Sequence, residues 1–153
     1  MLLRLPATAA IGAFLLACPI TAYAADFAIQ KMGDPGKYTG CMAVNPAGSL
    51  GYLAIGDQVA MFVTAPALAV AKGADVSGTW SIDGSTPASF AAQAGSANTV
   101  TIDVPNSAEA VVALTTGKTL TVIANGKTVK APLDGTAQAF TALIGCMGEL
   151  ESQ

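Results

Sequence analysis

Few residues in this chain have the types and spacing that catalysis requires, and the most informative feature is an absence. The 153 residues include ten acidic residues, seven basic residues and no histidine. Histidine is the general base of Ser-His-Asp and Cys-His nucleophilic sites and a common zinc ligand. We therefore expect none of these sites in their usual forms, and a hydrolase would need paired carboxylates or a Ser-Lys arrangement.

Five of the aspartates are the candidates for paired carboxylates. All but Asp103 adjoin a glycine or an expected turn, and aspartate is frequent in turns because its side chain accepts hydrogen bonds from nearby backbone amides. The Ser-x-x-Lys spacing of a Ser-Lys site does not occur. We predict turn roles and no catalytic residue. The five candidates are Asp57, Asp75, Asp83, Asp103 and Asp134.

Metal and cofactor sites are not predicted either. Methionine thioethers bind Cu(I), but there is no Met-x-Met cluster, so the simpler role for these side chains is core packing. No Gly-x-Gly-x-x-Gly or phosphate-binding loop precedes a helix. Trp80 is expected in the core, and Tyr38, Tyr52 and Phe62 are the aromatic residues that an exposed binding face would use. The methionines considered are Met32, Met42, Met61 and Met147.

Cys41 and Cys146 lie near opposite ends of the expected domain and form an even pair. In an oxidising compartment such a pair is most simply a disulfide. It would close a loop of about a hundred residues, for which the chain-entropy model gives about 4 to 5 kcal/mol of stabilisation. A redox-active or metal-binding thiol pair is the alternative, but the Cys-x-x-Cys spacing typical of such thiols is absent.

The N-terminal residues have the pattern of an export signal. Arg4 precedes an apolar run over residues 7–18, and Ala22-Tyr23-Ala24 is a small-residue cleavage site. We predict a signal peptide over residues 1–24 and one β-rich domain over residues 25–153, located in the periplasm or secreted. Lipidation at Cys18 is the alternative. No later segment is apolar over the length of a membrane span.

The charge pattern argues against nucleic-acid binding. The chain has a net charge of −3, its only arginine is Arg4, and its lysines are scattered. Nucleic-acid binding requires a basic face that displaces counterions from phosphates. The expected partner is therefore an unidentified protein or envelope component, and the oligomeric state stays open.

Turn signals recur every eight to twelve residues, which is typical of a sandwich or barrel. Asn125-Gly126 is the strongest hairpin signal, and Gly56-Asp57 suits a type II′ turn. We predict a mainly β fold, an antiparallel β-sandwich or partly open barrel of about seven or eight strands. The expected strands are residues 38–45, 50–55, 58–64, 76–83, 88–94, 99–104, 119–124 and 127–131, with a crossing loop over residues 65–74.

Two helices complete the prediction. A cap signal over residues 106–109 introduces a short helix that stops at Gly117. In residues 137–150, Phe140, Leu143, Ile144 and Met147 recur at helical spacing, so a C-terminal helix should pack this face on the sheet. Cys146 lies near the same stripe and would attach the helix to the first strand.

Several of these short motifs occur together in a known group of proteins. They are Cys41-Met42-Ala43, Gly56-Asp57, Ile82-Asp83-Gly84, a helix ending at Leu114 before Gly117-Lys118, and Leu133-Asp134-Gly135-Thr136 followed by residues 139–146. This order resembles the small secreted alphaproteobacterial proteins related to the invasion-associated locus B family, over most of residues 38–148. The resemblance implies a periplasmic β-sandwich linked to host interaction or the envelope, and it transfers no functional residue. Members with more cysteines have a second bridge that this chain lacks.

The function that follows is a non-enzymatic exported accessory or binding module of the cell envelope. Two alternatives remain at this point: a small histidine-free hydrolase that uses paired carboxylates, and a lipid-anchored structural envelope protein.

Overall fold

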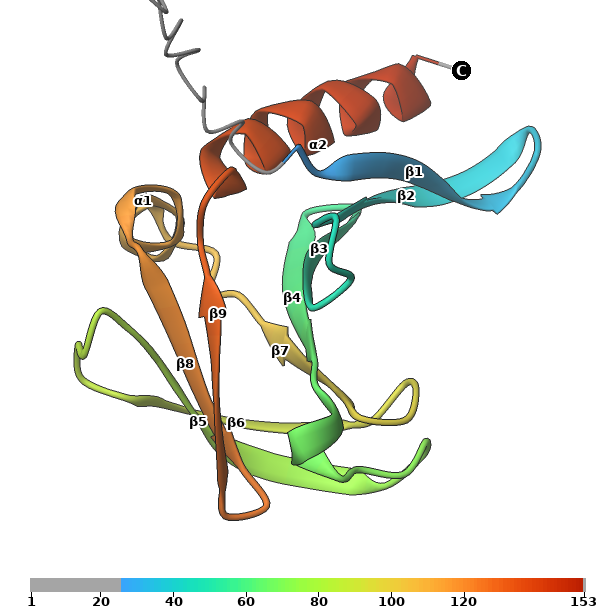
Figure 1. Ribbon diagram of the computed structural model, residues 1–153. Helices are drawn as coiled ribbons and strands as arrows, with labels where there is room; N and C mark the ends of the chain where they lie inside the picture. The colour runs from blue at the N-terminus through green and yellow to red at the C-terminus, as the bar shows by residue number, and fades with distance from the viewer. Residues whose placement is uncertain (1–25, 153) are drawn as a thin grey trace, which may run out of the picture.

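A computed structural model describes residues 26–152, and its mainly β fold confirms the predicted fold class. Two antiparallel sheets face each other, and the helix α2 lies across one end of them, alongside β1 and β2 (Figure 1). The predicted signal peptide and Cys18 lie outside the described residues. The elements are β1 (Ala28–Asp34), β2 (Lys37–Val44), β3 (Leu50–Ile55), β4 (Gln58–Thr64), η1 (Pro66–Leu68), β5 (Asp75–Ile82), β6 (Ala88–Gln93), β7 (Thr99–Asp103), α1 (Ala108–Thr116), β8 (Thr119–Ala124), β9 (Lys127–Pro132) and α2 (Thr136–Glu151).

The core lies between the two sheets. The first sheet has the strand order β1-β2-β3-β4-β7, and the second has the order β6-β5-β8-β9. Alternate residues on each strand point inward, so buried side chains line up across neighbouring strands. Tyr52 pairs with Met61, which pairs with Ile102, and all three are buried. In the second sheet Trp80 pairs with Val122 in the same way, which confirms the core position predicted for Trp80.

The first strand, β1, was not predicted. Its sequence, AIQKMGD, mixes polar and apolar residues, and most of its side chains are exposed. Such an edge strand lacks the alternation that marks a strand with one buried face. Residues 26–152 therefore contain nine strands where seven or eight were expected, and the strand predicted to be first is β2.

The turns follow the chemistry read from the sequence. Asn125 and Gly126 both have positive φ, as a type I′ hairpin requires, and so do Asp83 and Gly84. In the β3–β4 turn only Gly56 has positive φ, which fits the predicted type II′ geometry. The two-residue turns at Gly56-Asp57 and Asn125-Gly126 fix the register of the strands that they join.

Both helices form close to the predicted positions. The cap of α1 is Ser107, one residue later than the sequence signal suggested, and its hydroxyl accepts a hydrogen bond from the Ala110 N–H. The C-cap is Gly117, as predicted. The loop over residues 65–74 contains the short 3₁₀ turn η1, whose Leu68 is fully buried.

Candidate functional site

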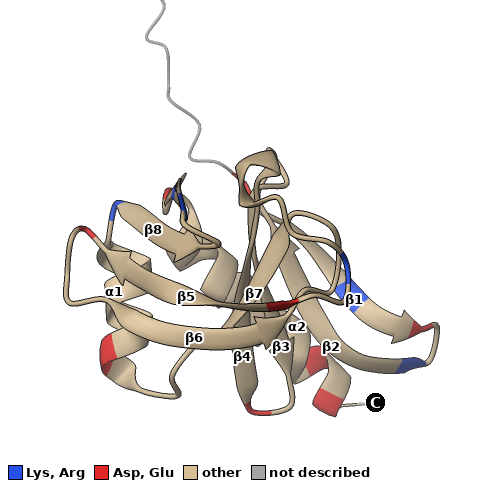
Figure 2. Cartoon of the chain, turned by 90° about the horizontal axis from the view of Figure 1, so that it is seen from below, with Lys and Arg blue, Asp and Glu red and all other residues tan. Residues whose placement is uncertain are grey.

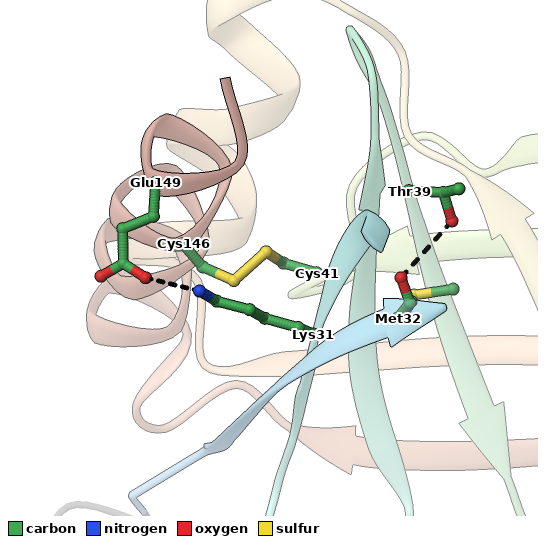
Figure 3. The surroundings of a disulfide bond; sticks show 6 residues. All are labelled: Lys31, Met32, Thr39, Cys41, Cys146 and Glu149. Atoms are coloured by element: carbon green, nitrogen blue, oxygen red, sulfur yellow. Dashed lines mark hydrogen bonds and ion pairs between the residues drawn. A yellow bond between two sulfur atoms is a disulfide. The ribbon is translucent and has the colours of Figure 1, made fainter. Parts of the chain in front are cut away.

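The predicted disulfide is confirmed. Cys41 points inward from β2 and is fully buried, while Cys146 lies on the core-facing side of α2 (Figure 3). Their Cα atoms are 6.2 Å apart. The bridge attaches α2 to the strand next to the edge of the first sheet.

An ion pair lies beside the disulfide. The Lys31 Nζ atom is 2.9 Å from the Glu149 Oε2 atom, which joins β1 to α2 (Figure 3). The same Nζ atom is 5.7 Å from the centre of the Tyr38 ring. Because both partners are partly exposed, this pair contributes little energy compared with the covalent link.

The candidate aspartates lie in turns or at strand ends, and all five are exposed. Asp83 lies in a turn, as predicted, but its carboxylate accepts hydrogen bonds from the backbone N–H groups of Lys118 and Thr119, which are distant in the sequence. Asp57 shares a surface hollow with another acidic residue, Glu151, and both are solvent-exposed. Within residues 26–152, no three His, Cys, Asp or Glu residues are grouped to hold a metal ion.

Of the candidate binding aromatics, Tyr52 is fully buried. Its ring packs edge-on against Phe140 with the ring centres 4.9 Å apart, and against Phe27 at 5.8 Å. Burial raises the pKa of Tyr52 to about 12, although the hydrogen bond with Thr136 opposes the shift. Tyr52 is therefore part of the core and not of a binding face.

An apolar groove lies between α2 and the β3–β4 hairpin, and we call it the α2 groove. It has a volume of about 320 Å³. The hairpin supplies Ala54, Gly56, Asp57 and Val59, and α2 supplies Phe140, Leu143, Ile144, Met147, Gly148 and Glu151. The α2 residues recur at helical spacing, so they form one face of the helix, which overlaps the core-facing side at Phe140 and Leu143.

Ile144 departs from the predicted packing. The sequence placed it on the sheet with Phe140 and Leu143, which are buried, but 72% of the Ile144 side chain is exposed. Ile144 instead lines the α2 groove, while Ala139, Leu143 and Cys146 of the same helix enter the core. Ile144 thus leaves a large apolar side chain in solvent at the edge of the α2 groove.

A second, smaller hollow continues the α2 groove toward α1. It shares Asp57 and Val59 with the groove and is lined further by Val104, Pro105, Asn106 and Val111. Val111 and its neighbour Val112 are 37% and 57% exposed. The apolar surface therefore extends from α2 past the β3–β4 turn to α1.

The charges around this surface have one sign. Neither hollow is lined by a lysine, while Asp57 and Glu151 line the larger one. Figure 2 shows acidic residues on α1, at the β3–β4 turn and near the C-terminal end of α2. The described lysines lie on β1, on β2, on β9 and in loops beside other strands.

Sequence reasoning did not find the α2 groove. The helical spacing gave a partial signal of a gap in the apolar face. Ile144 and Gly148 lie on the same side of α2, and of the two only Ile144 has an apolar side chain. The hairpin that forms the other wall is distant in sequence, so no local pattern could show that it meets α2.

The comparisons with known proteins add no relative: no family model, curated protein or solved structure matches the chain. None of the helices within residues 26–152 has the length and apolar character needed to cross a bilayer.

Proposed function

We propose that this chain is an exported, non-enzymatic binding module of the cell envelope, and that the α2 groove is its binding site. The observation that carries the proposal is the 72% exposure of Ile144 beside a groove lined by Phe140, Leu143 and Met147. Exposing such a side chain to water costs free energy, which burial against a partner would recover. The partner is a protein or another envelope component.

Export to the periplasm or beyond is part of the same proposal. The N-terminal signal pattern supports it, and so does the Cys41–Cys146 disulfide, because such bridges persist in oxidising compartments. A relationship to the invasion-associated locus B family also remains a proposal, based on the short motifs between residues 38 and 148. The intact mass of the exported protein tests how the N-terminal signal is processed, since cleavage after Ala24 and lipidation at Cys18 give different masses.

A carboxylate hydrolase is not proposed. Such an enzyme needs one carboxyl group that its surroundings keep protonated, typically by burial. Asp57 and Glu151 line the same groove, but both are exposed to solvent. Their position at an apolar surface fits recognition of an opposite charge better than proton transfer.

Site-specific photo-crosslinking tests the binding site. A photoreactive amino acid at Ile144 should give a discrete crosslinked species in the envelope of exporting cells. The matched control places it at Ile123, which is also a large exposed apolar residue but lies on β8 in the other sheet. A crosslink from both positions, or from neither, would show that the α2 groove is not the binding site.

A further inference from the structure

The groove face of α2 contains a glycine that the fold itself does not require. Gly145 and Gly148 both lie inside α2, and a Cβ atom added at either would meet no atom within 4 Å. Glycine in a helix interior is unfavourable relative to alanine. Packing within the described residues explains neither position, but only Gly148 lines the α2 groove.

A glycine at this position permits the backbone of another segment to approach α2 closely. Gly148 follows Ile144 by four residues and therefore lies on the same face, one turn further along. Because the backbone groups of a helix interior are already paired within the helix, an added strand would find no hydrogen-bonding edge here. The face suits a second helix, which would lie beside α2 over about 16 Å between Phe140 and Glu151.

The acidic residues around the groove indicate which charge a partner helix should have. Asp57 lies on the hairpin wall and Glu151 on the helix wall, and no lysine lines either hollow. A second copy of this chain would bring its own α2, with Glu151, against these carboxylates. Like charges at an interface oppose association, whereas lysine or arginine on the partner would complement them. Anionic lipid headgroups would be repelled for the same reason.

We propose that the α2 groove binds a basic amphipathic helix of another protein. Its apolar side chains enter the groove beside Ile144, its backbone approaches α2 at Gly148, and its lysine or arginine residues contact Asp57 and Glu151. This inference deepens the proposed function and rests on it, because it names the kind of partner that the same groove takes.

Labelled synthetic peptides test the inference by fluorescence anisotropy with the oxidised exported protein. The probe is a helical peptide of about 18 residues, long enough to form a helix, with leucine on one face and lysine on the other. Two controls are the same peptide with glutamate in place of lysine and a scrambled leucine-lysine peptide. We expect saturable binding of the probe and at least about tenfold weaker binding of both controls.

Two glycine variants separate helix stability from docking. Gly145→Ala and Gly148→Ala should both raise the thermal midpoint, because each replaces a helical glycine whose Cβ position is open. Of the two glycine variants, only Gly148→Ala should weaken probe binding, by about tenfold, since only Gly148 lines the groove.

Charge variants test the acidic residues. The double variant Asp57→Asn, Glu151→Gln should also weaken probe binding, whereas Asp34→Asn at the β1–β2 turn should leave probe binding unchanged.

Several outcomes would overturn the inference. They are equal binding of the glutamate or scrambled peptide, equal effects of the two glycine variants, and a dimer of this chain that Ile144→Asp dissociates. Binding of anionic vesicles that Ile144→Asp abolishes would also contradict it. If any of these is found while Ile144 still crosslinks to a discrete partner, the binding-module proposal stands and only the chemistry assigned to that partner is wrong.

Discussion

The hydroxyl oxygen of Tyr52 lies 3.0 Å from the hydroxyl oxygen of Thr136, and both side chains are fully buried. Tyr52 is on β3, in the first sheet, and Thr136 is the first residue of α2. This hydrogen bond therefore fixes the beginning of α2 on the sheet, as the Cys41–Cys146 disulfide fixes its second half. Together the two links hold the helix wall of the α2 groove.

A double-mutant cycle measures the first link. Tyr52→Phe should destabilise the fold by about 1 to 3 kcal/mol, because it leaves the Thr136 hydroxyl buried without its partner. Thr136→Val should have a similar cost. The double variant should lose less than the sum of the two, since it leaves no unpaired polar group. Urea unfolding of the four proteins tests this, and strictly additive losses would contradict the buried pair.

Alkaline pH should lower the free energy of unfolding through the buried Tyr52 hydroxyl. An unfolded tyrosine has a pKa near 10, whereas burial raises the pKa of Tyr52 to about 12 in the folded chain. The folded state thus holds this proton more tightly. Its contribution to stability is complete below about pH 10 and is lost as pH rises through about 12, by roughly 2 to 3 kcal/mol. Unfolding free energies measured across this range should fall more steeply for the wild type than for Tyr52→Phe. Parallel curves would argue against the shift.

Removing either cysteine should remove one bond and no more. Cys41→Ser and Cys146→Ser should each cost about 4 to 5 kcal/mol, the value expected for a loop closed over a sequence separation of 105 residues. The double variant should be no less stable than the single ones. Denaturant unfolding checks this, with free thiols counted by alkylation in the wild type. Two alkylatable thiols in the exported protein, or clearly additive losses, would show that the cysteines act separately.

The Lys31–Glu149 ion pair should contribute far less to the stability of the fold than the disulfide does. Lys31→Met removes the charge but keeps most of the aliphatic chain, so the loss should stay below about 1 kcal/mol and shrink with added salt. The thermal midpoints of this variant and of Cys146→Ser make the comparison. A loss from Lys31→Met as large as that from Cys146→Ser would contradict this, because the ion pair would then hold α2 on β1 and β2 as strongly as the covalent bond does.

The Asp83 turn gives a prediction away from the groove. Asp83 has a φ of 50°, and its carboxylate accepts hydrogen bonds from the backbone N–H groups of Lys118 and Thr119. Asp83→Ala should cost about 1 to 3 kcal/mol, because it loses both acceptors and places alanine in a left-handed conformation. Asp83→Asn should cost less, since asparagine tolerates this conformation and keeps one acceptor oxygen. Equal losses in thermal unfolding would contradict the assigned role.

The local features of this fold were readable from the sequence because turn chemistry and side-chain alternation act over a few residues. Asn125-Gly126 and the strand carrying Trp80 were predicted for that reason. The edge strand β1 was missed because an exposed edge has little alternation to detect. The disulfide was predictable only because the predicted domain contains two cysteines, which permit a single pairing.

The α2 groove could not be predicted in the same way. One wall comes from the β3–β4 hairpin and the other from α2, and their contact depends on how the sandwich closes. Helical spacing showed that Ile144 belongs to an apolar face, but it could not show how much of that face the sheet covers. The exposure of Ile144, at the boundary of the packed face, depends on tertiary structure and not on local sequence.

The Cys41–Cys146 bridge also encloses most of the chain in a covalent ring. Every loop from the end of β2 to the start of α2 lies between the two cysteines, including the exposed turns after β5 and β8. A protease that cuts once in any of these loops would produce two fragments that stay joined through the bridge and can retain their places in the sandwich. A single cut inside the ring therefore leaves the two parts of the domain covalently joined.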